Sequence, residues 1–229
     1  GEETLLRAGW DRGIEFEWSL DSAWIVFDQA DMNFNQDVFI VPSDGSAAPI
    51  NISRHPDNDG GARFSADAKA LAFSSERDGE EYDVWYVFLD RELEKLAEPE
   101  LEKYFEDAGK AAKKRKPLDP NKVRKALAAA AAAAVADAEA EPDPDASEKV
   151  ADGEGSEEEV DVPPFTTEDL ETAYLRLRKL TSLPGNESRL TMLSPGNAVL
   201  FSSSTSAPGV SGLYTVKWNG TGRKRLGDS

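Results

Sequence analysis

The sequence predicts an all-β fold, and two observations carry that prediction. The segments "EWSLDSAWIVFDQADMNFNQDVFIV" and "RFSADAKALAFSSERDGEEYDVWYV" share one design: an aromatic-Ser pair, an Asp, a strand ending in Phe, an acidic loop and an Asp-Val-aromatic strand. Aligning Ser19 with Ser65 gives a spacing of 46 residues, and the same spacing relates Phe27 to Phe73. Repeats of ~40–50 residues that contain several short strands are typical of β-propeller blades.

A third copy of the pattern occupies residues 189–227, where Ser194 opens the copy and Phe201 ends its second strand. We therefore expect about three four-stranded antiparallel blades. This is a partial β-propeller, because closed rings have about four to eight blades. The two end blades would expose apolar faces that neighbours must cover. The pattern thus predicts a segment of a longer propeller.

The strands can be placed from composition, because short runs of β-branched and aromatic residues lie between Asp, Gly and Ser turns. "SLDS" and "SADA" are predicted tight turns, in which Ser and Asp side chains bond nearby backbone amides. The expected strands are 23–27, 37–41 and 49–53 in the first copy, 70–74, 83–89 and 175–182 in the second, and 198–201, 212–218 and 223–226 in the third. One further outer strand is expected at residues 4–10, where Leu6 takes the place that Ile52 has in the first copy.

The second copy is interrupted between its third and fourth strands. Leu101, Tyr104 and Phe105 lie at helical spacing, which predicts a helix over residues 99–116. The expected domains are therefore blades at 1–90, a helical and acidic low-complexity insertion at 91–174, and the continuing blades at 175–229.

Further elements are expected inside the insertion. Asp119 and Pro120 suit the start of a second, alanine-rich helix. Residues 137–161 hold 12 acidic residues and few large apolar ones, so this stretch is predicted to be disordered. Thr166 or Thr167 is expected to cap a short helix before the blade resumes.

Charge and composition exclude several classes of function. The chain has 26 basic and 44 acidic residues, a formal net charge of -18, so we expect no nucleic-acid partner. It has no cysteine, which excludes disulfides, zinc-thiolate sites and thiol catalysis. No apolar run reaches the ~20 residues of a membrane span, and we expect a soluble chain without a cofactor.

The single histidine limits catalytic hypotheses. A Ser-His-Asp triad would have to use His55, which lies in the polar loop "RHPDNDGG" with Asp57 two residues away. An ordinary inter-strand loop explains the same composition, and we expect no catalytic residue in this chain.

Two charged motifs are also better explained by structure than by a site. In "DMNFNQD", Asp31, Asn33, Asn35 and Asp37 alternate as in a calcium loop, but position six is Gln rather than Gly and position twelve is Pro rather than Glu. A turn between strands, with no metal, is therefore expected. The basic run "KKRK" at residues 113–116 precedes the acidic tract, and charge neutralisation within the insertion is its expected role.

The repeats resemble those of TolB-type and tricorn-type, WD40-like propellers, whose blades join a Ser-Pro-Asp-Gly turn to an Ala-Phe strand, an Arg-Asp-Gly loop and an Ile-Tyr-Val strand. Arg77-Asp78-Gly79 fits that loop. With the insertion after "DVWYVFLDRELEKL", the whole chain is similar to the propeller region of bacterial tricorn-like serine peptidases of the C-terminal-processing class. In that family the propeller precedes a PDZ module and a serine-protease domain.

The resemblance implies a non-catalytic module that admits or orients peptide substrates for a protease domain outside this chain. Its partners would be a peptide or protein ligand and the remaining blades and protease domain of the parent chain, in the bacterial cytoplasm or periplasm. The alternative is a TolB-like protein-interaction scaffold with no linked enzyme. A sugar- or phosphate-acting propeller enzyme would need convergent acids and bases, which the sequence does not present.

Overall fold

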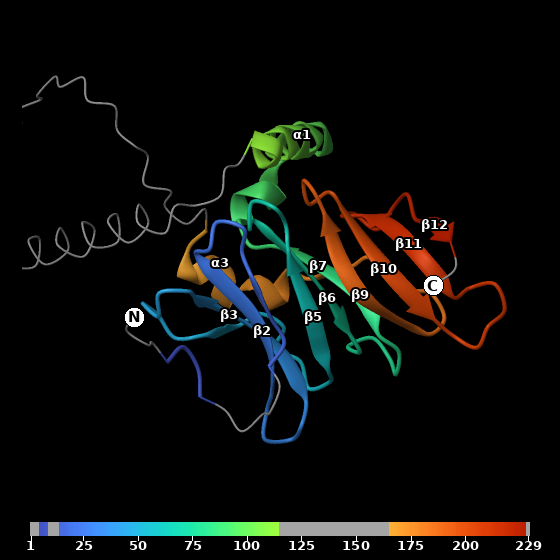
Figure 1. Ribbon diagram of the computed structural model, residues 1–229, viewed down its shortest axis with the longest axis horizontal. Helices are drawn as coiled ribbons and strands as arrows, with labels where there is room; N and C mark the ends of the chain where they lie inside the picture. Colours follow the sequence, from blue (N-terminus) through green and yellow to red (C-terminus); the bar gives the residue numbers. More distant parts are fainter. Residues whose placement is uncertain (1–4, 9–13, 115–164, 228–229) are drawn as a thin grey trace, which may run out of the picture. The chain divides into compact units, whose positions relative to one another are not determined.

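Three four-stranded antiparallel sheets, one for each sequence repeat, form the body of the protein in the computed structural model (Figure 1). The structure describes residues 5–8, 14–114 and 165–227. Blade 1 contains β1 (Phe16–Trp18), β2 (Trp24–Ala30), β3 (Gln36–Pro42) and β4 (Ile50–Asn51). Blade 2 contains β5 (Asp59–Phe64), β6 (Ala70–Ser75), β7 (Asp83–Phe88) and β8 (Arg178–Lys179). Blade 3 contains β9 (Asn186–Leu193), β10 (Ala198–Ser204), β11 (Gly212–Lys217) and β12 (Lys224–Gly227).

The register confirms the predicted equivalence of the three repeats. Phe27, Phe73 and Phe201 each face an aromatic residue on the third strand of their own blade; these partners are Phe39, Trp85 and Tyr214. Because the same pairing recurs in each sheet, the blades are copies of one four-stranded unit. The open set of three blades is the partial β-propeller that the repeats predicted.

The two predicted Ser-Asp turns have the same hydrogen bonds. Ser65 Oγ donates to Asp67 Oδ1 at 2.6 Å and accepts from Ala70 N at 2.9 Å. In the first blade, Ser19 Oγ donates to Asp21 Oδ1 and accepts from Trp24 N. The side chains thereby satisfy backbone groups at the point where each second strand starts.

Apolar side chains between adjacent blades form the two main cores. The core between blades 1 and 2 contains Val26, Ile40, Leu71 and Phe73, together with Phe165 and Leu170 from the end of the insertion. The core between blades 2 and 3 contains Tyr86, Phe88, Val199 and Phe201, together with Leu101 and Phe105 from the start of the insertion. Adjacent blades are thus joined through continuous apolar faces, as expected for a propeller.

The described parts of the insertion lie between β7 and β8. They comprise η1 (Arg91–Lys95), α1 (Glu98–Lys114), α3 (Thr167–Glu171) and η2 (Ala173–Leu175). α1 confirms the predicted helix, and α3 begins with a capping box formed by Thr166 and Asp169. The alanine-rich segment and the acidic tract at 137–161 lie outside the described residues. Within the described residues, no helix has the length and apolar character needed to cross a membrane.

The expected outer strand at residues 4–10 is not formed at residues 5–8, and that prediction is wrong there; the rest of the stretch lies outside the described residues. Leu6 still packs on Ile25, Phe27 and Val41 of blade 1. The apolar residue at this position is therefore explained by its packing on blade 1 and not by a strand. An outer strand forms only by pairing with another strand of its own blade. The described strands all belong to the three sheets, so residues 5–8 have no such partner among them.

Blade 1 exposes an apolar face whose counterpart in blade 2 is buried. Trp18 pairs with Ile25 as Phe64 pairs with Leu71, so the two aromatics hold equivalent positions. Phe64 is 7% exposed against blade 1, whereas Trp18 is 49% exposed. With Phe16, Trp18 lines a cavity of about 440 Å³ on this face.

An apolar dye should bind this face. We expect the double substitution Phe16→Ser and Trp18→Ser to lower the fluorescence of native protein with anilinonaphthalene sulfonate by about half or more, since it removes the two exposed aromatic side chains that line this face. Titration of folded protein with the dye measures this. Leu226→Ser, at the opposite end of the chain, is the control and should leave most of the signal unchanged.

Candidate functional site

The first strands of the three blades lie side by side, and one polar cavity is lined by β5, by β9 and by residues of blade 1 next to β1 and on β2 and β3. It has a volume of about 430 Å³ and is lined by Glu15, Asp28, Gln36, Gly60, Gly61, Arg63, Ser74, Tyr82, Glu187, Ser188, Arg189 and Leu190. Every blade contributes to this list, so the cavity exists only because the repeats are assembled side by side. Residues from the innermost strands of neighbouring blades are those that line the centre of a propeller.

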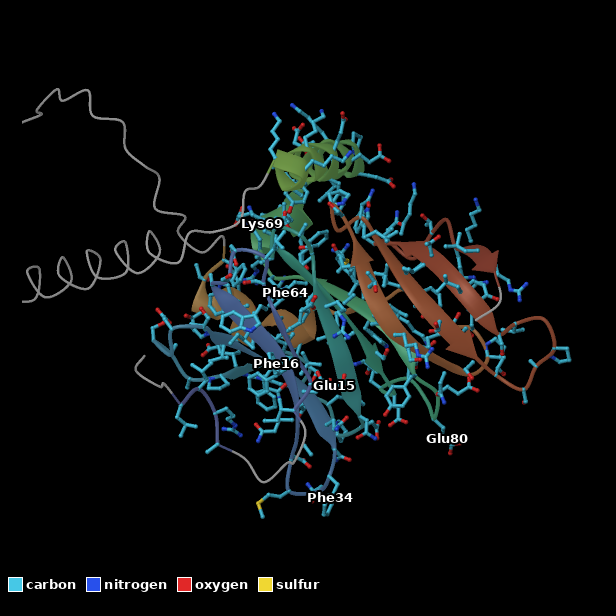
Figure 2. All side chains as sticks on the ribbon, in the orientation of Figure 1. Glu15, Phe16, Phe34, Phe64, Lys69 and Glu80 are labelled. Atoms are coloured by element: carbon cyan, nitrogen blue, oxygen red, sulfur yellow. The ribbon has the colours of Figure 1, made fainter. Side chains whose placement is uncertain are left out.

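The cavity lies at the end of the sheets away from α1. Gln36 follows the β2–β3 loop, which contains Phe34, and Tyr82 ends the β6–β7 loop, which contains Glu80. Figure 2 shows Phe34 and Glu80 at one end of the sheets and Lys69 at the other end, near α1. The hairpin loops of blades 1 and 2 therefore flank the cavity.

A β-bulge in β5 and another in β9 shape the cavity wall. The register shifts opposite Phe73 and opposite Phe201, which places Gly61 and Arg189 at the same position of their blades. Gly61 has a φ of 66° and Arg189 a φ of 55°. Both backbones are left-handed, a conformation that glycine adopts freely and that strains an arginine.

Asp28 joins blade 1 to the bulge of blade 2. Its Oδ2 atom accepts a hydrogen bond from Gly61 N at 2.7 Å. An added Cβ at Gly60 would lie 3.0 Å from the same oxygen, so the backbone approaches the carboxylate closely. Burial, and to a smaller extent the charge of Glu15, raise the pKa of Asp28 to about 6, against the hydrogen bond from Gly61 and the charge of Arg63.

Glu187 closes the inner end of the cavity and is fully buried. It accepts hydrogen bonds from Thr181 Oγ1, from Leu183 N at 3.1 Å and from Val84 N at 3.2 Å. Burial raises its pKa to about 7, and the charge of Asp83 adds to this, while the hydrogen bonds oppose it. This carboxyl therefore titrates near neutral pH.

Two arginines bring positive charge to the cavity. Arg63 on β5 is half-buried and donates from Nη1 to Ala62 O at 2.8 Å. Arg189 on β9 is exposed, and within the described part of the chain its guanidinium has no hydrogen bond or ion pair. Arg189 is thus a cavity-lining cation without an internal partner.

A larger cavity of about 570 Å³ lies beside the β6–β7 loop and is mostly acidic. Lys179 Nζ bridges Asp78 and Asp83 there at 2.6 Å to each carboxylate. The charges that face this cavity are therefore partly neutralised within the chain.

The structure places His55 in the β4–β5 loop, as predicted. Its Nδ1 atom accepts a hydrogen bond from Asp57 N at 3.2 Å and lies 3.5 Å from Asp57 Oδ2. None of the hydrogen bonds of this side chain within the described residues involves a serine. His55 does not line the central cavity.

The calcium-like loop forms a turn between β2 and β3. Asp31 Oδ1 accepts hydrogen bonds from Asn33 N and Asn35 N, while Asp37 Oδ1 accepts from Ser53 Oγ. These oxygens thus stabilise the loop and the blade edge. The described residues include no group of three or more His, Cys, Asp or Glu placed to hold a metal ion. Of the basic run 113–116, residues 115 and 116 lie outside the described residues.

Sequence reasoning did not single out the charged residues of the cavity: Glu15, Asp28, Arg63, Glu187 and Arg189. A signal was present, because Glu15, Gly61 and Arg189 each precede the repeated Phe of their own copy by 12 residues. The glycine of the second repeat indicates the left-handed backbone that Gly61 shares with Arg189, whereas Glu15 precedes β1, which pairs with β2 without a bulge.

Comparison with known proteins supports the fold. No family model matches the sequence. No curated protein sequence matches it either. Among solved structures, a putative TolB from Agrobacterium tumefaciens is similar with a TM-score of 0.50 and 10% identity, over 95% of this chain and 50% of that chain. The crystal structure of the tricorn protease is similar with a TM-score of 0.55 and 13% identity, over 99% of this chain and 19% of that chain.

The chain therefore has the fold of a TolB-like, tricorn-type β-propeller region. It spans half the length of that TolB chain and about a fifth of that tricorn protease chain.

Proposed function

We propose that the chain is a non-catalytic propeller module of a tricorn-like serine peptidase, which admits or orients peptides for a protease domain elsewhere in the parent protein. The observation that carries the proposal is the polar cavity at the innermost strands, to which all three blades contribute. It combines carboxylates, guanidinium groups and exposed backbone, which are the groups that bind peptides. The likeness in fold to the tricorn protease supports the choice of parent.

The apolar outer face of blade 1 supports a larger assembly. Phe16 and Trp18 are exposed where the equivalent face of blade 2 is covered by its neighbour. We propose that further blades of the parent chain cover this face. The bound peptide would then be enclosed by a ring of which this chain forms one arc.

Peptide binding without hydrolysis tests the proposal. We expect capped peptides of six to ten residues to bind the purified chain in calorimetric titrations and to remain intact by mass spectrometry. His55→Ala should change neither result, because His55 does not line the cavity. Hydrolysis that persists through purification and disappears in His55→Ala would show that the module is itself an enzyme.

A TolB-like interaction scaffold is the second candidate, favoured by the similarity to a TolB structure over 95% of this chain. Such a scaffold binds folded proteins through a rim. The two candidates differ in their ligand. Binding of short unstructured peptides supports the first, whereas a chain that ignores them and captures only folded partners supports the second.

A further inference from the structure

The bulge of β9 contains an arginine at the position where the bulge of blade 2 has a glycine. Arg189 adopts a φ of 55°, close to the 66° of Gly61 in the equivalent bulge. A left-handed backbone disfavours every residue with a Cβ, and glycine would form the same bulge without strain. The bulge therefore explains the conformation but not the choice of arginine.

Internal contacts do not explain the arginine either. Within the described residues, the Arg189 guanidinium makes no hydrogen bond or ion pair, whereas the other left-handed arginine, Arg54, lies 4.8 Å from the ring centroid of Tyr174. Both are exposed on the surface of the described chain. Arg189 differs because it lines the central cavity.

Two of the three acidic side chains of the cavity already accept hydrogen bonds within the chain, and the third, Glu15, is exposed. Asp28 accepts from Gly61 N, and Glu187 accepts from Val84 N of blade 2 and from Thr181 Oγ1 and Leu183 N in the segment between β8 and β9. Arg63, the second guanidinium of the cavity, donates to the backbone oxygen of Ala62 and retains further N–H groups. The cavity thus offers guanidinium donors that no internal carboxylate pairs with, alongside the exposed carboxylate of Glu15.

We propose that Arg189, assisted by Arg63, binds a carboxylate of the peptide ligand in this cavity. The proposal rests on the proposed function, because it names the chemistry of the peptide that the same cavity takes. A planar guanidinium matches a carboxylate through two parallel N–H donors, and such charged hydrogen bonds are stronger than neutral ones. The carboxylate can be an acidic side chain or a free C-terminus, and the probes separate these sources.

The test uses three peptides of identical length in calorimetric titrations of the whole chain. The first is acetylated and amidated with one central Glu, the second replaces that Glu by Gln, and the third is the Gln peptide with a free C-terminal carboxylate. We expect at least one carboxylate peptide to bind about 10-fold tighter than the capped Gln peptide, as one charged hydrogen-bonded pair allows. Which of the two does so identifies the source.

Arg189→Gly is the decisive variant, because it introduces the residue that blade 2 has at this position and removes the guanidinium together with its aliphatic stem. It should abolish the 10-fold preference for carboxylate and leave the melting temperature within about 3 °C, since strain relief offsets the greater freedom of glycine in the unfolded chain. Arg189→Lys should keep part of the preference. Arg54→Gly is the matched control, the same change at a left-handed arginine outside the cavity, and should bind as the unaltered chain does.

The outcomes separate this proposal from the one on which it rests. If the unaltered chain binds all three peptides equally, or if Arg189→Gly keeps the preference, the carboxylate assignment is wrong and peptide binding stands. If the unaltered chain binds none of the peptides, the proposed function fails and the carboxylate assignment fails with it.

Discussion

Replacing Asp59 by asparagine is expected to lower the free energy of unfolding by about 3–5 kcal/mol. Arg77 Nη2 lies 3.0 Å from both carboxylate oxygens of Asp59, and neither side chain is more than 10% exposed. The guanidinium also contacts the rings of Phe73 and Trp85, with centroids 5.5 and 5.1 Å from Cζ. Without the carboxylate, Arg77 would remain buried between two rings with its charge unpaired.

The ionised form of Asp59 is not itself favoured at this buried position. Burial raises the pKa of Asp59 more than the nearby Arg77 lowers it, so the carboxylate is favoured less than in water. The loss in Asp59→Asn therefore comes from the arginine that is left behind. Removing both charges in Asp59→Asn with Arg77→Met should restore more than half of the lost stability.

Urea denaturation at pH 7 measures these differences. Asp78→Asn is the control, because it removes a carboxylate from an exposed pair with Lys179 and should have a much smaller effect. If Asp59→Asn were no more destabilising than Asp78→Asn, Arg77 would not depend on its partner. A double variant as unstable as the single one would show that packing around the arginine, and not charge, holds the site.

The sequence predicts those features of the fold that depend on residues within one blade and that recur in each repeat. Ser65 and Asp67 lie in one turn, where their side chains hydrogen-bond to each other and Asp67 accepts from the backbone amide of Lys69. The same two residue types therefore recur where that turn recurs. Phe73 and its partner Trp85 face each other across β6 and β7, and their mutual contact explains why an aromatic residue recurs at both positions in the repeats. Features of this kind identify a blade without knowledge of its neighbours.

The cavity was not predictable in the same way, because it depends on contacts between blades. In the sequence, nothing distinguishes Asp28 from other acidic residues near strand ends. The structure shows that it contacts the backbone of Gly61, 33 residues away. Glu187 reads as a surface residue of "GNESRL", yet it is fully buried beneath a turn of the preceding blade. The docking of Phe105 on blades 2 and 3 depends likewise on how the insertion folds back.

Blade 3 has a buried carboxylate, Glu187, at the position of Asp59 in blade 2, but it has no arginine at the position of Arg77. Asp59 pairs with Ser75 across the strands, and Glu187 pairs with Ser203 in the same way. The residue two places after Ser75 is Arg77, whereas two places after Ser203 it is Thr205. Ser203 Oγ is buried without a hydrogen-bond partner among the described residues. Glu187 is therefore a buried carboxyl that accepts hydrogen bonds but has no cationic partner in the part of the chain that the structure describes.

Replacing Glu187 by glutamine is expected to stabilise the protein above neutral pH by up to about 3 kcal/mol. The pKa of Glu187 rises from its ordinary value of 4.5 to about 7 in the folded chain. Because the folded pKa lies above the unfolded one, the contribution of this group to stability is complete below pH 4.5. It declines as pH rises and is lost above pH 7. Glutamine stays neutral at every pH and so escapes this loss. Its single carbonyl oxygen can accept from Val84 N and Thr181 Oγ1, but its NH₂ group then faces Leu183 N, which lowers stability by an amount that does not depend on pH.

Thermal or urea unfolding of both chains between pH 4.5 and 8.5 measures the effect. The difference in unfolding free energy between the two chains should be constant near pH 4.5, shift in favour of glutamine through pH 5–7 and be constant again above pH 8. Asp28→Asn is the matched control, because the pKa of Asp28 is raised only to about 6 and its separation from the unaltered chain should be complete at lower pH. A difference between the two chains that does not change with pH would mean that the three donors hold ionised Glu187 as strongly as burial opposes it.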